Sequence, residues 1–266
     1  MPVRLALERA THRLVVRRRL PPPFASARIY VSTEGGLRYL GRTMAKVDPA
    51  LLRLAAEFVR PGDTVWDVGA NMGLFSFAAA VAAGPTGHVL AVEADTDLAG
   101  QLLRSAADNT RHASVDVLPA AVFNELSVAR FHIARRSRST NYLEGFGSTM
   151  TGGVRSTRLV PTLTLDWLAG KFPVPDVLKI DVEGAELAVL AGGARVLAHS
   201  PAVICEVSAK NATAVSEILT GHGYTLYDGD RRPEERPEAT AAPPNTLAIA
   251  VPRPRPAAGA DTRVMA

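Results

Sequence analysis

The segment VWDVGANMG (residues 65–73) carries most of the information about the fold of this chain. A short apolar run ends in an aspartate, passes through a glycine-containing turn and leads into the longer apolar run LFSFAAAVAA (74–83). Runs of these lengths predict a buried strand and then a helix. Glycines suit the turn because they adopt positive φ angles and let a backbone approach a ligand closely. The segment therefore predicts a strand–turn–helix unit with a binding site at the carboxyl end of the strand.

The same alternation continues along the chain. Strands are expected at 64–68, 88–93, 114–122, 176–181 and 202–207, and helices at 49–58, 74–83, 98–109, 183–191 and 212–222. GYTLY (223–227) and NTLAIAV (245–251) read as a closing antiparallel pair. This rhythm predicts an α/β fold in which helices cover both faces of a mostly parallel sheet.

The predicted domain organisation has three parts. A basic arm or cap covers residues 1–44, a main domain covers 45–251 and a disordered tail covers 252–266. Within the arm, residues 1–20 read as a short basic helix and 28–32 as a strand. The rhythm breaks in an insert over 123–162, where 127–133 alternates like an edge strand, 134–158 reads as a substrate loop, and 158–168 gives a strand and a short helix.

Composition narrows the class of protein. Apolar residues make up 47% of the 266 residues, which allows a sizeable core, and the formal net charge is +4. The single cysteine, Cys205, excludes an internal disulfide, and no apolar run reaches the roughly 20 residues of a membrane span. The abundance of arginine and alanine suggests a GC-rich bacterial genome. We therefore expect a soluble, cytoplasmic protein.

The glycine turn and a second acid together define a cofactor site. Glu93 ends the next strand, 24 residues after Gly69, near the spacing of about 20 that is typical of a carboxylate bonding ribose hydroxyls. A dinucleotide and S-adenosylmethionine compete for such a site. The dinucleotide fingerprint G-x-G-x-x-G is absent, and a carboxylate at Asp67 would attract the sulfonium and ammonium of S-adenosylmethionine. The predicted cofactor-binding residues are Asp67, Gly69, Ala70, Asn71, Gly73 and Glu93.

A second motif, LKIDVEGAELAVLAGG (178–193), places acids at the carboxyl end of another strand. Lys179 and Asp181 are two residues apart and so share one face, where Lys179 could polarise the acceptor or pair with Asp181, and the pairing is favoured. Glu183 and Glu186 are expected in the first helical turn, where acids are favoured for structural reasons. That structural interpretation is preferred for Glu186, whereas Asp181 is predicted to be functional.

With both motifs in place, the sequence resembles the FkbM family of methyltransferases. The resemblance rests on VWDVGANMGLFSF, AVEAD, TLTLDWL, VLKIDVEGAELAVLAGG, AVICEV and the NTLAIAV ending, over about 45–251. It implies a class I methyltransferase fold, a Rossmann-like three-layer sandwich whose mostly parallel seven-stranded sheet has an antiparallel last strand. It also implies S-adenosylmethionine as donor and mostly O-methylation, with natural products or sugars as acceptors.

Methylation of a hydroxyl requires a group that takes its proton. The candidates are Asp181, Glu183 and Glu206, and more remotely His132, which reads as an ordinary edge histidine. Carboxylates would suit Mg²⁺, but no spacing demands it, so no metal is predicted. The run Arg135–Arg138 in the insert would suit an anionic or polyhydroxylated acceptor, or serve as a solvated loop.

The alternative hypothesis is an RNA-binding methyltransferase-like module that uses the basic arm. The arm lacks the interleaved aromatic residues that stack on bases. We therefore expect a small-molecule or glycan acceptor and no nucleic acid, and the arm would allow a weak contact with a membrane surface.

Overall fold

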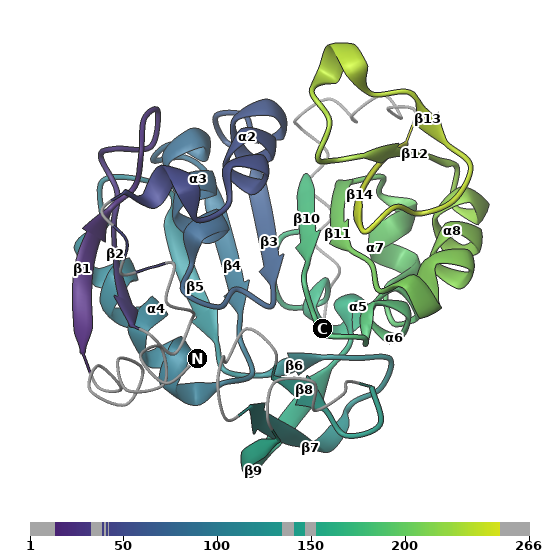
Figure 1. Ribbon diagram of the computed structural model, residues 1–266, viewed down its shortest axis with the longest axis horizontal. Coiled ribbons are helices and arrows are strands. Elements are labelled where there is room, and N and C mark those ends of the chain that lie inside the picture. The colour runs from purple at the N-terminus through teal and green to yellow at the C-terminus, as the bar shows by residue number, and fades with distance from the viewer. Residues whose placement is uncertain are drawn as a thin grey trace, which may run out of the picture.

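A large sheet forms the centre of the molecule, and its helices lie on both faces (Figure 1). The computed structural model describes residues 14–32, 39, 41, 43–134, 141–146 and 153–250. The sheet runs in the order β13 (Glu238–Ala239), β12 (Tyr224–Asp228), β14 (Asn245–Ala250), β11 (Ala202–Glu206), β10 (Val177–Ile180), β3 (Thr64–Val68), β4 (His88–Val92) and β5 (Ser114–Leu118).

The strand directions confirm the predicted sheet. The strands from β11 to β5 are parallel, while β14 is antiparallel to both β11 and β12. The sheet has eight strands rather than seven, because the two-residue β13 adds to its edge through β12. A strand this short leaves no periodic signal in the polar, proline-rich segment 228–244.

Two cores flank the sheet because successive strand residues point to opposite faces. On one face lie α2 (Pro49–Phe58), α3 (Leu74–Ala83) and α4 (Thr96–Asp108), packed on Val65 and Val89. On the other lie α5 (Leu165–Leu168), α6 (Glu186–Ala191), α7 (Ala194–Ala198) and α8 (Ala212–Gly221), packed on Trp66 and Leu90. Short 3-10 helices, η3 (Met44–Lys46), η5 (Ala209–Asn211) and η6 (Pro233–Glu235), lie in the connections.

The insert forms a second, smaller sheet, at the bottom of the view in Figure 1. Its order is β6 (Ala121–Val122), β9 (Val154–Leu163), β7 (Ser127–Ala134) and β8 (Tyr142–Leu143). The prediction of an edge strand at 127–133 is wrong, because β7 lies between β9 and β8. Alternation of apolar and polar residues indicates that one face of a strand is buried, but it does not indicate whether other strands pair with one or both of its edges. Parts of the predicted loop, 135–140 and 147–152, lie outside the described residues.

The basic arm is a hairpin where the structure describes it. β1 (Val15–Arg19) pairs antiparallel with β2 (Arg28–Ser32), so the helix predicted over 1–20 is wrong for 15–19, and residues 1–13 lie outside the described part. The predicted strand at 28–32 is confirmed. β2 binds α4: the Tyr30 N–H donates to Ser105 Oγ (2.9 Å), and the Arg28 N–H donates to Asn109 Oδ1 (3.0 Å). Tertiary pairing with β2 outweighs any local preference of the arginine run.

None of the described helices is long and apolar enough to cross a bilayer. The tail beyond residue 250 is not described, so the predicted boundaries of arm, main domain and tail stay predictions.

Candidate active site

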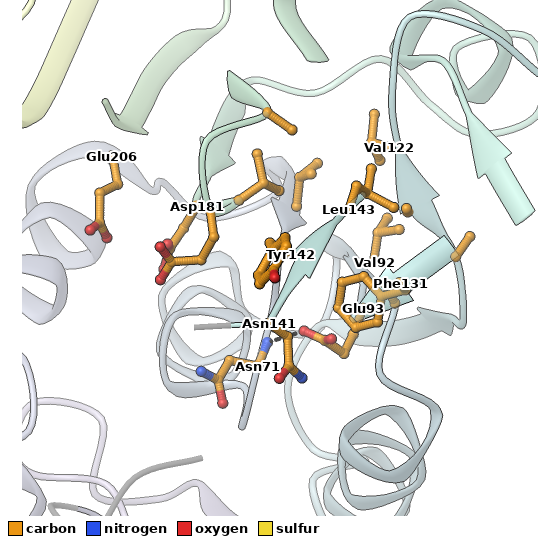
Figure 2. Close-up of a pocket in the computed structure, with 18 of the residues that line it drawn as sticks. Asn71, Val92, Glu93, Val122, Phe131, Asn141, Tyr142, Leu143, Asp181 and Glu206 are labelled. Atoms are coloured by element: carbon orange, nitrogen blue, oxygen red, sulfur yellow. Dashed lines mark hydrogen bonds between the residues drawn. The ribbon is translucent and has the colours of Figure 1, made fainter. Parts of the chain in front are cut away.

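A cavity of about 370 Å³ lies at the carboxyl ends of β3, β4, β10 and β11, between the two sheets. Apolar side chains, mostly from the second sheet, gather on one side of it together with Glu93, while the carboxylates of Asp181 and Glu206 lie on the other (Figure 2). Tyr142 lies between the two groups. The lining of the cavity includes Asn71, Val92, Glu93, Val122, Phe131, Leu143, Asp181, Glu183 and Glu206.

The glycine turn forms one wall of this cavity. The N–H groups of Gly69 and Ala70 both donate to the carbonyl of Val92, which ties the turn to the end of β4 (2.9 and 3.0 Å). Gly69 has φ +75°, and a Cβ there would collide with the carbonyl oxygen of Asp181. Asn71 adopts φ 51°, and the turn then enters α3. The backbone therefore requires glycine at position 69, as the sequence predicted.

Glu93 meets the turn across the end of β4. Its Oε2 accepts the N–H of Asn71 (2.8 Å), and its Oε1 accepts the N–H of Asp95 (2.7 Å), the first of which is drawn in Figure 2. Burial raises the pKa of Glu93 to about 7, although both hydrogen bonds act in the opposite direction. The predicted meeting of the turn and the second acid in one crevice is confirmed.

Asp67 lies behind the turn rather than in the cavity. Its side chain is 0% exposed, accepts a hydrogen bond from Ser76 Oγ (2.5 Å) and pairs with Lys179 Nζ (3.0 Å). Ala70 and Gly73 are likewise absent from the cavity lining. This position does not support the predicted direct attraction between Asp67 and a bound cation. Asp67 instead pairs with Lys179, which in turn contacts two residues that line the cavity, Gly69 and Asp181.

Lys179 connects the two motifs. Its Nζ donates to the carbonyl of Gly69 (2.8 Å) and also approaches Asp181 Oδ2 (3.4 Å), which confirms the predicted pairing with Asp181. Burial disfavours the charged ammonium, but the attraction of Asp67 and Asp181 is stronger and raises the pKa of Lys179. The lysine therefore stays charged and holds the glycine turn against β10.

The three candidate bases all line the cavity. The charge of Asp181, burial and a hydrogen bond that protonated Glu206 donates to Asp181 raise the pKa of Glu206 to about 8. Burial and the charges of Asp181 and Glu186 raise the pKa of Glu183 to about 7. Carboxyl groups with such pKa values take up and release protons near neutral pH, which is what a general base requires.

Glu183 lies in a turn, so its predicted place in the first helical turn is wrong. α6 begins only at Glu186, because Gly184 has φ +85°, which is not a helical conformation. Position 184 also needs glycine, because a Cβ there would collide with the carbonyl oxygen of Phe146. Glu186 is buried, and it accepts hydrogen bonds from the Gly184 N–H (3.0 Å) and from Asn211 Nδ2 (2.6 Å). The structural interpretation of Glu186 is therefore confirmed, and the turn leaves Glu183 facing the cavity.

The second sheet is attached to the main domain beside Glu93, a feature that the sequence analysis missed. Buried Asp95 accepts hydrogen bonds from Asn141 Nδ2 (3.0 Å) and Arg158 (3.3 Å). The segment 141–146 is held at its other end, where Lys210 Nζ donates to the carbonyl of Phe146 (2.6 Å). Asn141, Tyr142 and Leu143 thereby reach the cavity. Only the neighbouring AVEAD motif, which contains Asp95, offered a signal for this contact.

The remaining candidates lie elsewhere. His132 contacts Thr157 Oγ1 (2.9 Å) within the second sheet and does not line the cavity. The run Arg135–Arg138 lies outside the described residues. Within the described ranges, no three His, Cys, Asp or Glu side chains are grouped as metal ligands.

The chain is similar in sequence to known proteins over the range that contains most of the cavity. A family model, "Methyltransferase FkbM domain", matches residues 67–226. Hexuronic acid methyltransferase AglP of Haloferax volcanii is 29% identical over 164 residues, which is 60% of this chain. The match spans 62% of the length of that relative.

Solved structures with similar folds include two further methyltransferases. Methyltransferase FkbM from Methylobacillus flagellatus has a TM-score of 0.44 at 16% identity, over 75% of this chain and 52% of that chain. A methyltransferase from Geobacter sulfurreducens has a TM-score of 0.45 at 16% identity, over 80% and 84%.

Proposed function

The chain belongs to the FkbM methyltransferase family, and from this premise we propose that it is an S-adenosylmethionine-dependent O-methyltransferase. The acceptor that we propose is a hydroxyl group of a sugar or natural product. The observation that carries the proposal is a single cavity in which the glycine turn and Glu93 face a cluster of carboxylates. A sugar acceptor is supported by the similarity to a hexuronic acid methyltransferase.

The residues present fit the cofactor. Each oxygen of Glu93 accepts one backbone hydrogen bond and has a further lone pair for a ribose hydroxyl. Asn71 also lines the cavity, and its Oδ1 is a buried acceptor for which the described part of the chain provides no hydrogen-bond partner. The apolar side of the cavity, with Val122, Phe131 and Leu143, would hold an adenine ring.

S-adenosylmethionine, when bound, supplies a methyl group activated by a positively charged sulfur. The chain contributes position and proton transfer. The walls of the cavity hold the acceptor oxygen close and in line, which removes much of the entropic barrier. Transfer would form the bond between that oxygen and the methyl carbon and break the bond from this carbon to sulfur, whose electron pair stays on the sulfur, while the hydroxyl proton would pass to a carboxylate of this chain.

We propose Glu183 as the group that takes this proton. Its pKa of about 7 leaves a large ionised fraction at neutral pH, whereas Glu206 shares a hydrogen bond with Asp181 and has a higher pKa. General base catalysis of this kind contributes about 10²- to 10⁴-fold. Asp181 and Glu206 would then orient the acceptor through hydrogen bonds.

Calorimetry and a transfer assay test the two halves of the proposal. The wild-type protein should bind S-adenosylhomocysteine, and Glu93→Ala should weaken binding at least tenfold. Glu217→Gln, on the exposed face of α8, serves as the control. Glu183→Gln should bind normally but transfer labelled methyl groups at least 100-fold more slowly. Absence of binding by the wild-type protein would refute the proposed function.

A further inference from the structure

We infer that the acceptor is uncharged and rich in hydroxyl groups, and that it binds against Asp181, Glu183 and Glu206. The inference rests on the proposed function and names the class of acceptor. It starts from the charge of the cavity. Among the described residues that line it, five carry carboxyl groups, namely Asp48, Glu93, Asp181, Glu183 and Glu206, and none is Lys, Arg or His.

The nearby lysines do not balance these acids. Lys179 is 5% exposed, and its ammonium already contacts the carbonyl of Gly69 and the carboxylates of Asp67 and Asp181. Lys210 donates to the carbonyl of Phe146 and does not line the cavity. A carboxylate on the acceptor would therefore face like charges in a partly buried space, where salt screens them weakly.

Hydrogen-bonding capacity favours hydroxyl groups over a cation. Glu183 and Glu206 are each protonated for part of the time near neutral pH, so each presents both a donor and an acceptor. Hydroxyl groups also donate and accept, whereas an ammonium group only donates and a carboxylate only accepts. The sulfonium of the donor would also repel an ammonium group on an acceptor that is held close to it.

Matched acceptors test the inference. The wild-type protein would be assayed with labelled donor at pH 7 against sets of aryl glycosides built on glucose, galactose and mannose, each as the neutral hexoside, the uronide and the amino sugar. We expect kcat/KM for one neutral hexoside to exceed that of its two charged counterparts at least tenfold. A uronide or an amino sugar used equally well would overturn the inference.

The failure of the inference can be told apart from that of the proposed function. A protein that binds S-adenosylhomocysteine but methylates no neutral hexoside overturns the inference alone. A protein that does not bind the nucleoside refutes the proposed function.

A variant and a pH series identify the source of the selectivity. The groups that act on Glu206 are Asp181, Glu183 and Lys179. As Glu183 and Glu206 lose protons between pH 6 and 9, the hexoside-to-uronide ratio should rise at least threefold. Glu206→Gln should lower the ratio at pH 8 at least threefold and weaken its pH dependence, because only Glu183 of the pair then loses a proton, while Glu217→Gln on α8 should change neither. An unaltered ratio in Glu206→Gln would overturn the inference.

Discussion

Replacing Lys179 by methionine should lower the free energy of unfolding by about 3 to 5 kcal/mol, the range for breaking a buried ion pair. The lysine and Asp67 are 5% and 0% exposed, and 3.0 Å separates Nζ from the carboxylate. In the variant, the Asp67 carboxylate keeps the Ser76 hydroxyl but loses its buried counter-charge. The carbonyl of Gly69 also loses its hydrogen bond from Nζ. Both losses act on the folded state, because water solvates these groups in the unfolded chain.

Urea denaturation measures this change, and a thermal melt should show a decrease in Tm of about 6 to 20 °C for a domain of this size. A double-mutant cycle provides the control. Asp67→Asn combined with Lys179→Met removes both charges, so the double variant should be more stable than the sum of the two single losses predicts. The affinity for S-adenosylhomocysteine should also decrease at least tenfold in Lys179→Met, because the turn loses its attachment to β10. A loss below about 1 kcal/mol, or additive single effects, would refute the reasoning.

Three further predictions concern the turn, the second acid and the insert. Gly69→Ala should weaken S-adenosylhomocysteine binding at least tenfold in calorimetry, because its Cβ would collide with a backbone carbonyl, while Gly100→Ala, which meets nothing within 4 Å, should bind normally and serves as the control. Since burial raises the pKa of Glu93 from 4.5 to about 7, its ionisation opposes folding, an effect absent below pH 4.5 and complete above pH 7. Between these pH values, wild-type unfolding free energy should fall relative to Glu93→Gln by up to about 3 kcal/mol, and parallel urea-denaturation profiles would contradict this. Gly184→Ala should displace the Phe146 carbonyl and speed hydrogen exchange over 141–146, and unchanged exchange would count against it.

Local pattern was sufficient for the main sheet and its helices. β3 and α3 have the predicted bounds, because the apolar runs stop at Gly69 and at Gly84, and both glycines have positive φ angles. Asp48 caps α2 from the residue just before it, accepting the N–H of Leu51 (2.9 Å). In these segments the residues that form the recognisable pattern are also the ones that determine the local structure, because they are neighbours in sequence.

The predictions failed where partners distant in sequence decide the structure. The arginine-rich segment was predicted to be helical, yet residues 15–19 form strand β1 because β2 is available to pair with them. Glu183 was assigned to a helix, but the contact between Gly184 and Phe146, which are distant in sequence, favours a turn. No local propensity reports such contacts.

The sequence by itself determined the strand–turn–helix unit, the need for glycine at position 69 and the meeting of that turn with Glu93, because each depends on a few consecutive residues or on one parallel crossover. Only the tertiary structure decided that Asp67 lies behind the turn and that Asn141 and Tyr142 reach the cavity. Asp67 points away because alternation along β3 turns it toward α3, where Ser76 and Lys179 hold it. Asn141 arrives through a hydrogen bond to Asp95, 46 residues earlier, and that pairing depends on the packing of two sheets.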